Sequence, residues 1–78
     1  MIDQEKIDDY TLALMYLVCF KDHYGARAWK GFDRDTLDRL HEKGWISTAK
    51  TKAKSVVVTA EGEQKMRQLF EKYFTDTA

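Results

Sequence analysis

The sequence has no proline, one cysteine and only four glycines among its 78 residues. Because Cys19 is alone, no disulfide can form within the chain, and a lone thiol in an apolar run is typical of a small core residue in a reducing compartment. The longest wholly apolar run, Leu12 to Phe20, is far shorter than the ~20 residues that a membrane span needs. We therefore expect a soluble, cytoplasmic protein that forms a single domain over residues 1–78.

Charge of one sign is missing from part of the chain. From Lys43 to Ala60 there are four lysines and no acidic residue, although the whole chain has thirteen bases and thirteen acids. Residues 1–20 hold one base and four acids (−3), residues 21–54 nine and five (+4), and residues 55–78 three and four (−1). This polarity indicates either an anionic partner or self-association in which the ends meet the middle.

The first helix is expected to begin near Asp8 or Asp9, either of which suits an N-cap, and to continue to Phe20. Its apolar residues occupy all sides, whereas a surface helix of a small domain has one apolar stripe. We therefore predict a homodimer. The predicted interface side chains are Leu12, Met15, Tyr16 and Cys19.

The second helix is predicted over residues 33–43, where both ends have sequence signals. Asp33 suits the N-cap. Gly44 suits the left-handed position after the last turn, with Trp45 packing back on Leu40, as in a Schellman ending. Between the first two helices, residues 26–30 could form a helical turn or a short strand, and we favour the turn.

A β-hairpin follows, with Ile46 in one strand and the β-branched run 56–58 in the other. The connecting residues 48–54 contain no Gly, Asn, Asp or Pro, so they predict an extended or mobile tip rather than a tight turn. Thr59 is expected to cap a last helix. Its apolar side chains recur at helical spacing: Met66, Leu69, Phe70, Tyr73 and Phe74.

A helix ending "RLHEKGWI", a hairpin, and "VVVTAEG" opening a last helix resemble winged helix-turn-helix domains, most closely the antibiotic-resistance type of bacterial regulators. The chain is also similar to a small family of uncharacterised bacterial proteins of this length, through "ARAWKGFDRDTLDRLHEKGWI" and "KAKSVVVTAEG". The resemblance implies an α+β fold, a small winged-helix-like domain. Its three main helices and hairpin wing would follow the order helix, short turn, helix, strand, strand, helix.

Two functions are compatible with this pattern. In the first, the wing binds double-stranded DNA by phosphate contacts, since lysine suits phosphate and reads no bases. The candidate residues are Lys50, Lys52 and Lys54, with Arg34, Arg39 and Lys43 from the second helix. The outward face of that helix is acidic, through Asp35, Asp38 and Glu42, which opposes groove binding. The alternative is a protein-interaction or dimerisation module with no role in nucleic-acid binding.

Catalysis has little support in the sequence. His23 and His41 are expected on different elements, and neither has a visible orienting partner. The spacing of histidines and carboxylates matches no metal site, and "GARAWKG" lacks the Lys-Ser/Thr ending of a phosphate-binding loop. We therefore expect a protein that is not an enzyme, with no cofactor, no metal and no small-molecule substrate.

Overall fold

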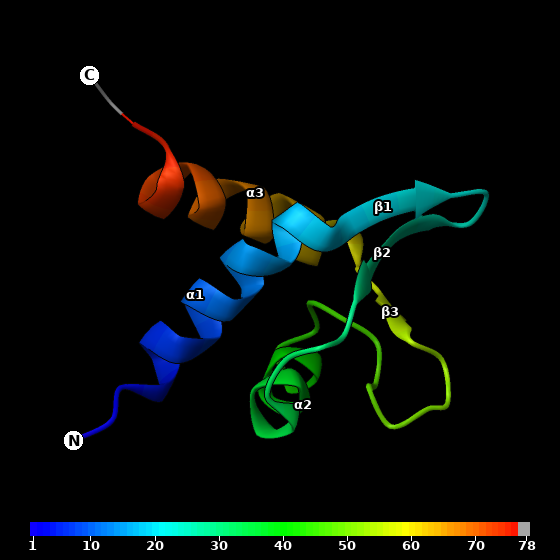
Figure 1. The fold of residues 1–78 in the computed structure, drawn as a ribbon, viewed down its shortest axis with the longest axis horizontal. Coiled ribbons are helices and arrows are strands. Elements are labelled where there is room, and N and C mark those ends of the chain that lie inside the picture. Colours follow the sequence, from blue (N-terminus) through cyan, green and yellow to red (C-terminus); the bar gives the residue numbers. More distant parts are fainter. Residues whose placement is uncertain (77–78) are drawn as a thin grey trace.

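The computed structural model describes residues 1–76, which form three α-helices and a three-stranded antiparallel sheet (Figure 1). The elements are α1 (Gln4–Met15), a 3-10 turn η1 (Tyr16–Val18), β1 (Cys19–Asp22), β2 (Gly25–Trp29), α2 (Arg34–Glu42), β3 (Ser55–Val57) and α3 (Ala60–Phe74). The expected α+β class with three main helices is confirmed.

Helix α1 begins and ends earlier than the sequence indicated. Its N-cap is Asp3, whose carboxylate accepts a hydrogen bond from the backbone N–H of Lys6 at 3.0 Å. The expected cap at Asp8 or Asp9 is therefore wrong. The helix stops at Met15, and Cys19 begins a strand instead of continuing the helix. The apolar run was ambiguous because strands and buried helices share such runs, and pairing with β2 decides in favour of the strand.

The sheet has the order β1-β2-β3, with β2 in the centre. Residues 26–30 lie mostly in β2, so the favoured helical turn is wrong and the strand alternative is correct. Phe20 pairs with Arg27, and Arg27 pairs with Val57 on its other side. Side chains alternate between the two faces of a strand, so these three lie in one row on the same face.

Helix α2 ends as predicted. Asp33 is the N-cap and accepts hydrogen bonds from the backbone N–H and the hydroxyl of Thr36. Gly44 has φ +81°, and the N–H of Trp45 donates to the carbonyl of Leu40 at 3.1 Å, which completes a Schellman ending. The chain then pairs Ile46 with Val58 in a single antiparallel bridge, which confirms that these two segments come together.

Helix α3 starts against the end of α2. Thr59 is its N-cap, as predicted, and its hydroxyl also donates to the carbonyl of Gly44 at 2.8 Å. Gly62 in the first turn packs directly on the backbone of Trp45, so that a Cβ there would overlap the Trp45 carbonyl. The start of α3 therefore needs a residue without a side chain.

The core lies between the helices and the inner face of the sheet. Its largest fully buried side chains include Leu12, Met15, Leu40, Ile46 and Met66. The predicted stripe of α3 is buried at Met66 and Leu69, while its aromatic end packs on α1, with the Tyr10 and Tyr73 ring centroids 4.5 Å apart. No helix within residues 1–76 is long and apolar enough to cross a membrane.

The winged-helix resemblance is not confirmed. A helix-turn-helix places a second helix immediately before the recognition helix. Here the element before α2 is strand β2, and the chain between α1 and α2 forms the β1-β2 hairpin. Figure 1 shows this hairpin projecting away from α1 and α3, with α2 below the hairpin.

Candidate nucleic-acid interface

The three lysines of the predicted tip lie on the segment between the Ile46 bridge and β3, here termed the lysine loop (residues 47–54). Lys50, Lys52 and Lys54 are all exposed. The backbone of the loop is irregular rather than extended, so the expected period-two alternation does not apply. The three lysines therefore share exposure to solvent on one short loop, and not a common face of a strand.

The lysine loop is fixed to the end of β2 by Lys30. Its ammonium group donates to the carbonyls of Ala49 and Thr51, both at 2.8 Å, and its backbone N–H donates to the carbonyl of Lys54 at 3.2 Å. Ala49 is buried in the core. The loop is therefore tied at several points, in contrast to the mobile tip expected from the sequence.

Next to the loop lies the outer sheet face, defined here by Phe20, Arg27, Trp29, Ser55 and Val57. On the opposite face Ala26, Ala28 and Val56 are buried. The rings of Phe20 and Trp29 contact each other, with centroids 5.1 Å apart. Arg27 is held in place by Ser55, whose hydroxyl accepts from Nε at 2.8 Å and whose carbonyl accepts from Nη2 at 3.2 Å.

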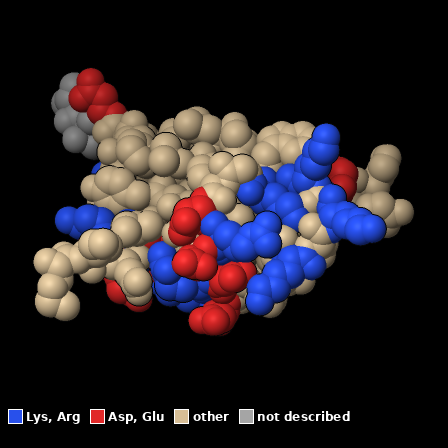
Figure 2. All heavy atoms as spheres, turned by 60° about the horizontal axis from the view of Figure 1, so that its bottom comes forward, with Lys and Arg blue, Asp and Glu red and all other residues tan. Residues whose placement is uncertain are grey.

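The sheet and the loop carry a net positive charge. Residues 19–30 and 47–58 together hold six bases and one acid, a net charge of +5, so the remaining residues hold seven bases and twelve acids, a net charge of −5. Figure 2 shows Lys and Arg side chains gathered over the sheet and loop at the right, and acidic side chains grouped near the centre over α2. This arrangement favours an anionic ligand on the sheet side.

Helix α2 contributes less than the sequence indicated, because two of its bases bind an internal carboxylate. Arg39 contacts Oδ1 of Asp8 at 2.8 Å, and Lys43 contacts Oδ2 at 2.9 Å. Asp8 is fully buried. Burial would lower the pKa of Lys43, but its hydrogen bonds to Asp8 and Glu5 outweigh that effect and raise it. Of the three predicted α2 contacts, only Arg34 is an exposed side chain.

The four predicted dimer residues occupy different environments. Leu12 and Met15 are fully buried within the chain's own core, so they cannot contact a second copy. Tyr16 is exposed but stacks on Phe70, with ring centroids 4.9 Å apart. Cys19 is half-buried, and burial together with the Glu63 carboxylate raises the pKa of its thiol. Besides Tyr16, α1 and η1 expose the apolar side chains Ile7, Tyr10, Leu14 and Leu17, here termed the α1 stripe.

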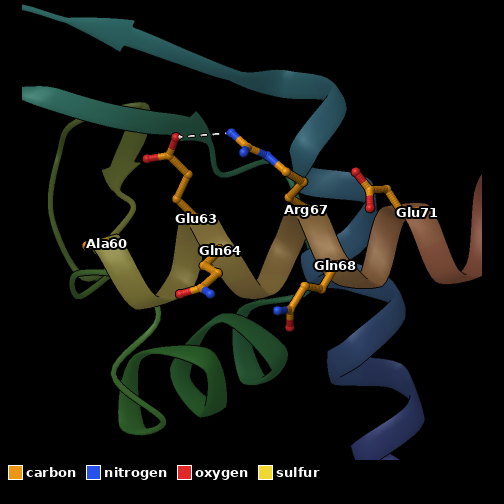
Figure 3. Close-up of a pocket in the computed structure, with 6 residues that line it drawn as sticks. All are labelled: Ala60, Glu63, Gln64, Arg67, Gln68 and Glu71. Atoms are coloured by element: carbon orange, nitrogen blue, oxygen red, sulfur yellow. Dashed lines mark ion pairs between the residues drawn. The ribbon is translucent and has the colours of Figure 1, made fainter.

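Other side chains of the types used in catalysis or metal binding already have partners within the protein. The Nδ1 of His41 lies 2.9 Å from the carbonyl of Ile46, so this nitrogen carries the proton and donates it. A shallow hollow runs along α3, lined by side chains of that helix alone, among them Glu63, Arg67 and Glu71 (Figure 3). Glu63 pairs there with Arg67 at 3.9 Å, so the charges offset each other. Within residues 1–76 no group of three His, Cys, Asp or Glu side chains could hold a metal ion.

The sequence analysis missed the outer sheet face. The signal was present in "GARAW", where small residues alternate with Arg27 and Trp29 as in a half-buried strand. It was weak because the strand has only five residues and its partner β1 was assigned to a helix. Neither Phe20 nor Arg27 was therefore considered as a ligand contact.

Comparison with known proteins identifies the family. The Domain of unknown function (DUF6429) family matches residues 3–76. An uncharacterised protein, y4hR, of Sinorhizobium fredii is 49% identical over 74 residues, which cover 95% of this chain and 96% of that protein. No solved structure matches the chain. The similarity to a small uncharacterised bacterial family is thus confirmed, and the chain belongs to the DUF6429 family.

Proposed function

We propose that this protein binds nucleic acid through the lysine loop and the adjoining sheet. The ammonium groups of Lys50, Lys52 and Lys54 are suited to backbone phosphates, which lysine contacts as a point charge. Lysine–phosphate contacts carry no base information, so binding through the loop alone is independent of sequence. Helix α2 is unsuited to such a contact, because the carboxylates on its exposed side repel phosphates.

The observation that carries this proposal is the separation of charge between residues 19–30 and 47–58 and the rest of the molecule, +5 against −5. One of these bases, Lys21, pairs with Glu63 of α3 at 3.1 Å, whereas the three loop lysines are exposed. The lysine loop has no carboxylate of its own to neutralise its three exposed lysines. The anchoring of the loop by Lys30 adds to this, because a loop that is already ordered loses less conformational entropy when a ligand binds.

Fluorescence anisotropy with labelled 20-nucleotide probes of random sequence, single-stranded and duplex, at 50 mM salt tests the proposal. We expect binding by the wild-type protein, and a clear loss when Lys50, Lys52 and Lys54 are replaced by Gln. The matched control replaces Lys6, Lys65 and Lys72 by Gln, which removes the same charge from α1 and α3. Equal loss in both triple variants, or no binding by the wild type, would contradict the proposal.

The α1 stripe supports a second candidate function, self-association or binding of a partner protein. Tyr10, Leu14 and Leu17 recur at helical spacing and are 38%, 41% and 66% exposed. Contiguous exposed apolar side chains of this kind mark interaction surfaces in soluble proteins. A homodimer formed by α1 therefore remains our proposal, with the α1 stripe in place of Leu12 and Met15.

Sedimentation equilibrium at micromolar concentration tests this second candidate. We expect a species of twice the 9.2 kDa chain mass, and a monomer after Leu14→Glu. Leu17→Glu should act in the same way. A wild-type protein that sediments only as the 9.2 kDa chain would contradict it.

A further inference from the structure

The outer sheet face exposes two aromatic rings in contact with each other. Trp29 is 51% exposed, although Trp side chains are usually well buried, and Phe20 beside it is half-buried. The rings lie on neighbouring strands, β1 and β2, and stand on the side of the sheet away from the buried Ala26 and Ala28. They form an apolar platform of two rings, tilted 38° to each other, that the helices of the core do not bury.

The surroundings of this platform are basic. Arg27 lies on the same face between Phe20 of β1 and Val57 of β3, fixed by its hydrogen bonds to Ser55. The acid on this face is Asp22 at the far end of β1, where its carboxylate already accepts from the N–H of Tyr24 at 2.8 Å. An apolar protein partner would gain nothing from this charge, whereas a polyanion with flat apolar groups matches both features.

The platform adjoins the lysine loop directly. Trp29 pairs with Ser55 across β2 and β3, and the next residue back along the chain is Lys54. The backbone N–H of Lys30 donates to the carbonyl of Lys54, which extends the pairing one step beyond the strands. A ligand whose bases lie on the rings therefore has its phosphates beside Lys54, at the end of the loop.

We infer that the ligand is single-stranded nucleic acid, with unpaired bases stacked on Phe20 and Trp29 and the backbone directed along the lysine loop. This inference rests on the proposed function and specifies its ligand. In a duplex the faces of the bases are covered by their neighbours, so only unstacked bases can contact aromatic rings in this way. Stacking accepts every base, so binding is tolerant of sequence.

The test compares a labelled 20-nucleotide oligothymidylate with a 20-base-pair duplex in the same anisotropy assay. We expect tighter binding to the single strand. Trp29→Ala should weaken that binding about five- to 150-fold, the range that loss of one stacked base gives, and leave duplex binding unchanged. Trp29→Phe should retain most of the affinity because it keeps an aromatic ring. The control is Phe74→Ala, which removes an aromatic ring that is 41% exposed on α3, outside the sheet.

Intrinsic fluorescence supplies a second readout, since stacking of a base on Trp29 should quench its emission, and the quenching should disappear in Trp29→Phe. If the duplex binds at least as tightly as the single strand and Trp29→Ala changes neither, the inference is overturned while the proposed function stands. If Trp29→Ala instead converts a dimer to a monomer in sedimentation, a second copy covers the platform and the inference is again overturned. Failure of both probes to bind wild-type protein would overturn the proposed function itself.

Discussion

Replacement of Asp8 by Asn should be among the most damaging single substitutions in this protein. Asp8 is fully buried, and its carboxylate forms ion pairs with both Arg39 and Lys43. Asn has nearly the same shape and lacks the negative charge. It would leave two cations around a buried amide, one of whose ends is a donor and cannot accept a hydrogen bond from them.

The expected loss of stability depends on how well water can solvate Arg39 and Lys43 once Asp8 is neutral. Removing one partner of a buried ion pair costs about 3–5 kcal/mol. The side chains of Arg39 and Lys43 are each 26% exposed, so both can turn partly to solvent once Asp8 is neutral. We therefore expect a loss of about 3 kcal/mol in the free energy of unfolding, near the lower end of that range.

Urea denaturation followed by circular dichroism measures this loss. A thermal melt supplies a second measurement. In a domain of this size each kcal/mol of lost stability lowers Tm by about 4–8 °C, so Tm should fall by about 12–24 °C. The matched control is Glu5→Gln, which removes the second carboxylate from Lys43 at 3.1 Å. Glu5 is 81% exposed, so its loss should cost less than about 1 kcal/mol. Equal costs for the two variants would refute the electrostatic account of how α1 and α2 are joined.

Three further substitutions, the first with a matched control, test other parts of the fold. Gly62→Ala should destabilise by about 1–3 kcal/mol despite the better helix propensity of Ala, because its Cβ overlaps the Trp45 carbonyl, whereas Gly31→Ala, with open space around it, should be nearly neutral in the same urea titrations. Gly44→Ala should cost about 1 kcal/mol, since φ +81° penalises a β-carbon, and no change would contradict the left-handed ending of α2. Hydrogen bonds from Thr36 lower the pKa of Asp33 below 3.8, so its stabilising effect is present above pH 3.8 and is lost as pH falls through the lower folded-state pKa. The stability difference between wild type and Asp33→Asn should therefore change over that acidic range and stay constant from pH 5 to 7.

Local signals in the sequence predicted the ends of α2 and the start of α3. The caps Asp33 and Thr59 and the glycine at position 44 act through neighbours within a few residues, so their roles can be read without the tertiary structure. The pairing of Ile46 with residue 58 was predictable for a similar reason, since β-branched residues flank a short connection.

The features that the sequence did not reveal depend on contacts between distant residues. The end of α1 at Met15 is decided by the pairing of β1 with β2, which no local propensity encodes. Arg39 looked available for phosphate because its partner Asp8 lies 31 residues away and was assigned to a helix cap. The platform of Phe20 and Trp29 was hidden by the same error, because it exists only once residue 20 is placed in a strand.

The salt dependence of binding tests the central claim most directly, namely that the lysine loop contacts phosphates. Each phosphate that is neutralised contributes about −0.7 to the slope of log K against log salt on a single strand and about −0.9 on a duplex. Replacing Lys50, Lys52 and Lys54 by Gln should therefore flatten the slope by about 2 on a single strand or about 3 on a duplex, with unchanged Tm. The control in which Lys6, Lys65 and Lys72 are replaced should keep the wild-type slope. A slope that is the same in the loop variant and the wild type would contradict the account, because the exposed lysines would then make no contact with the ligand.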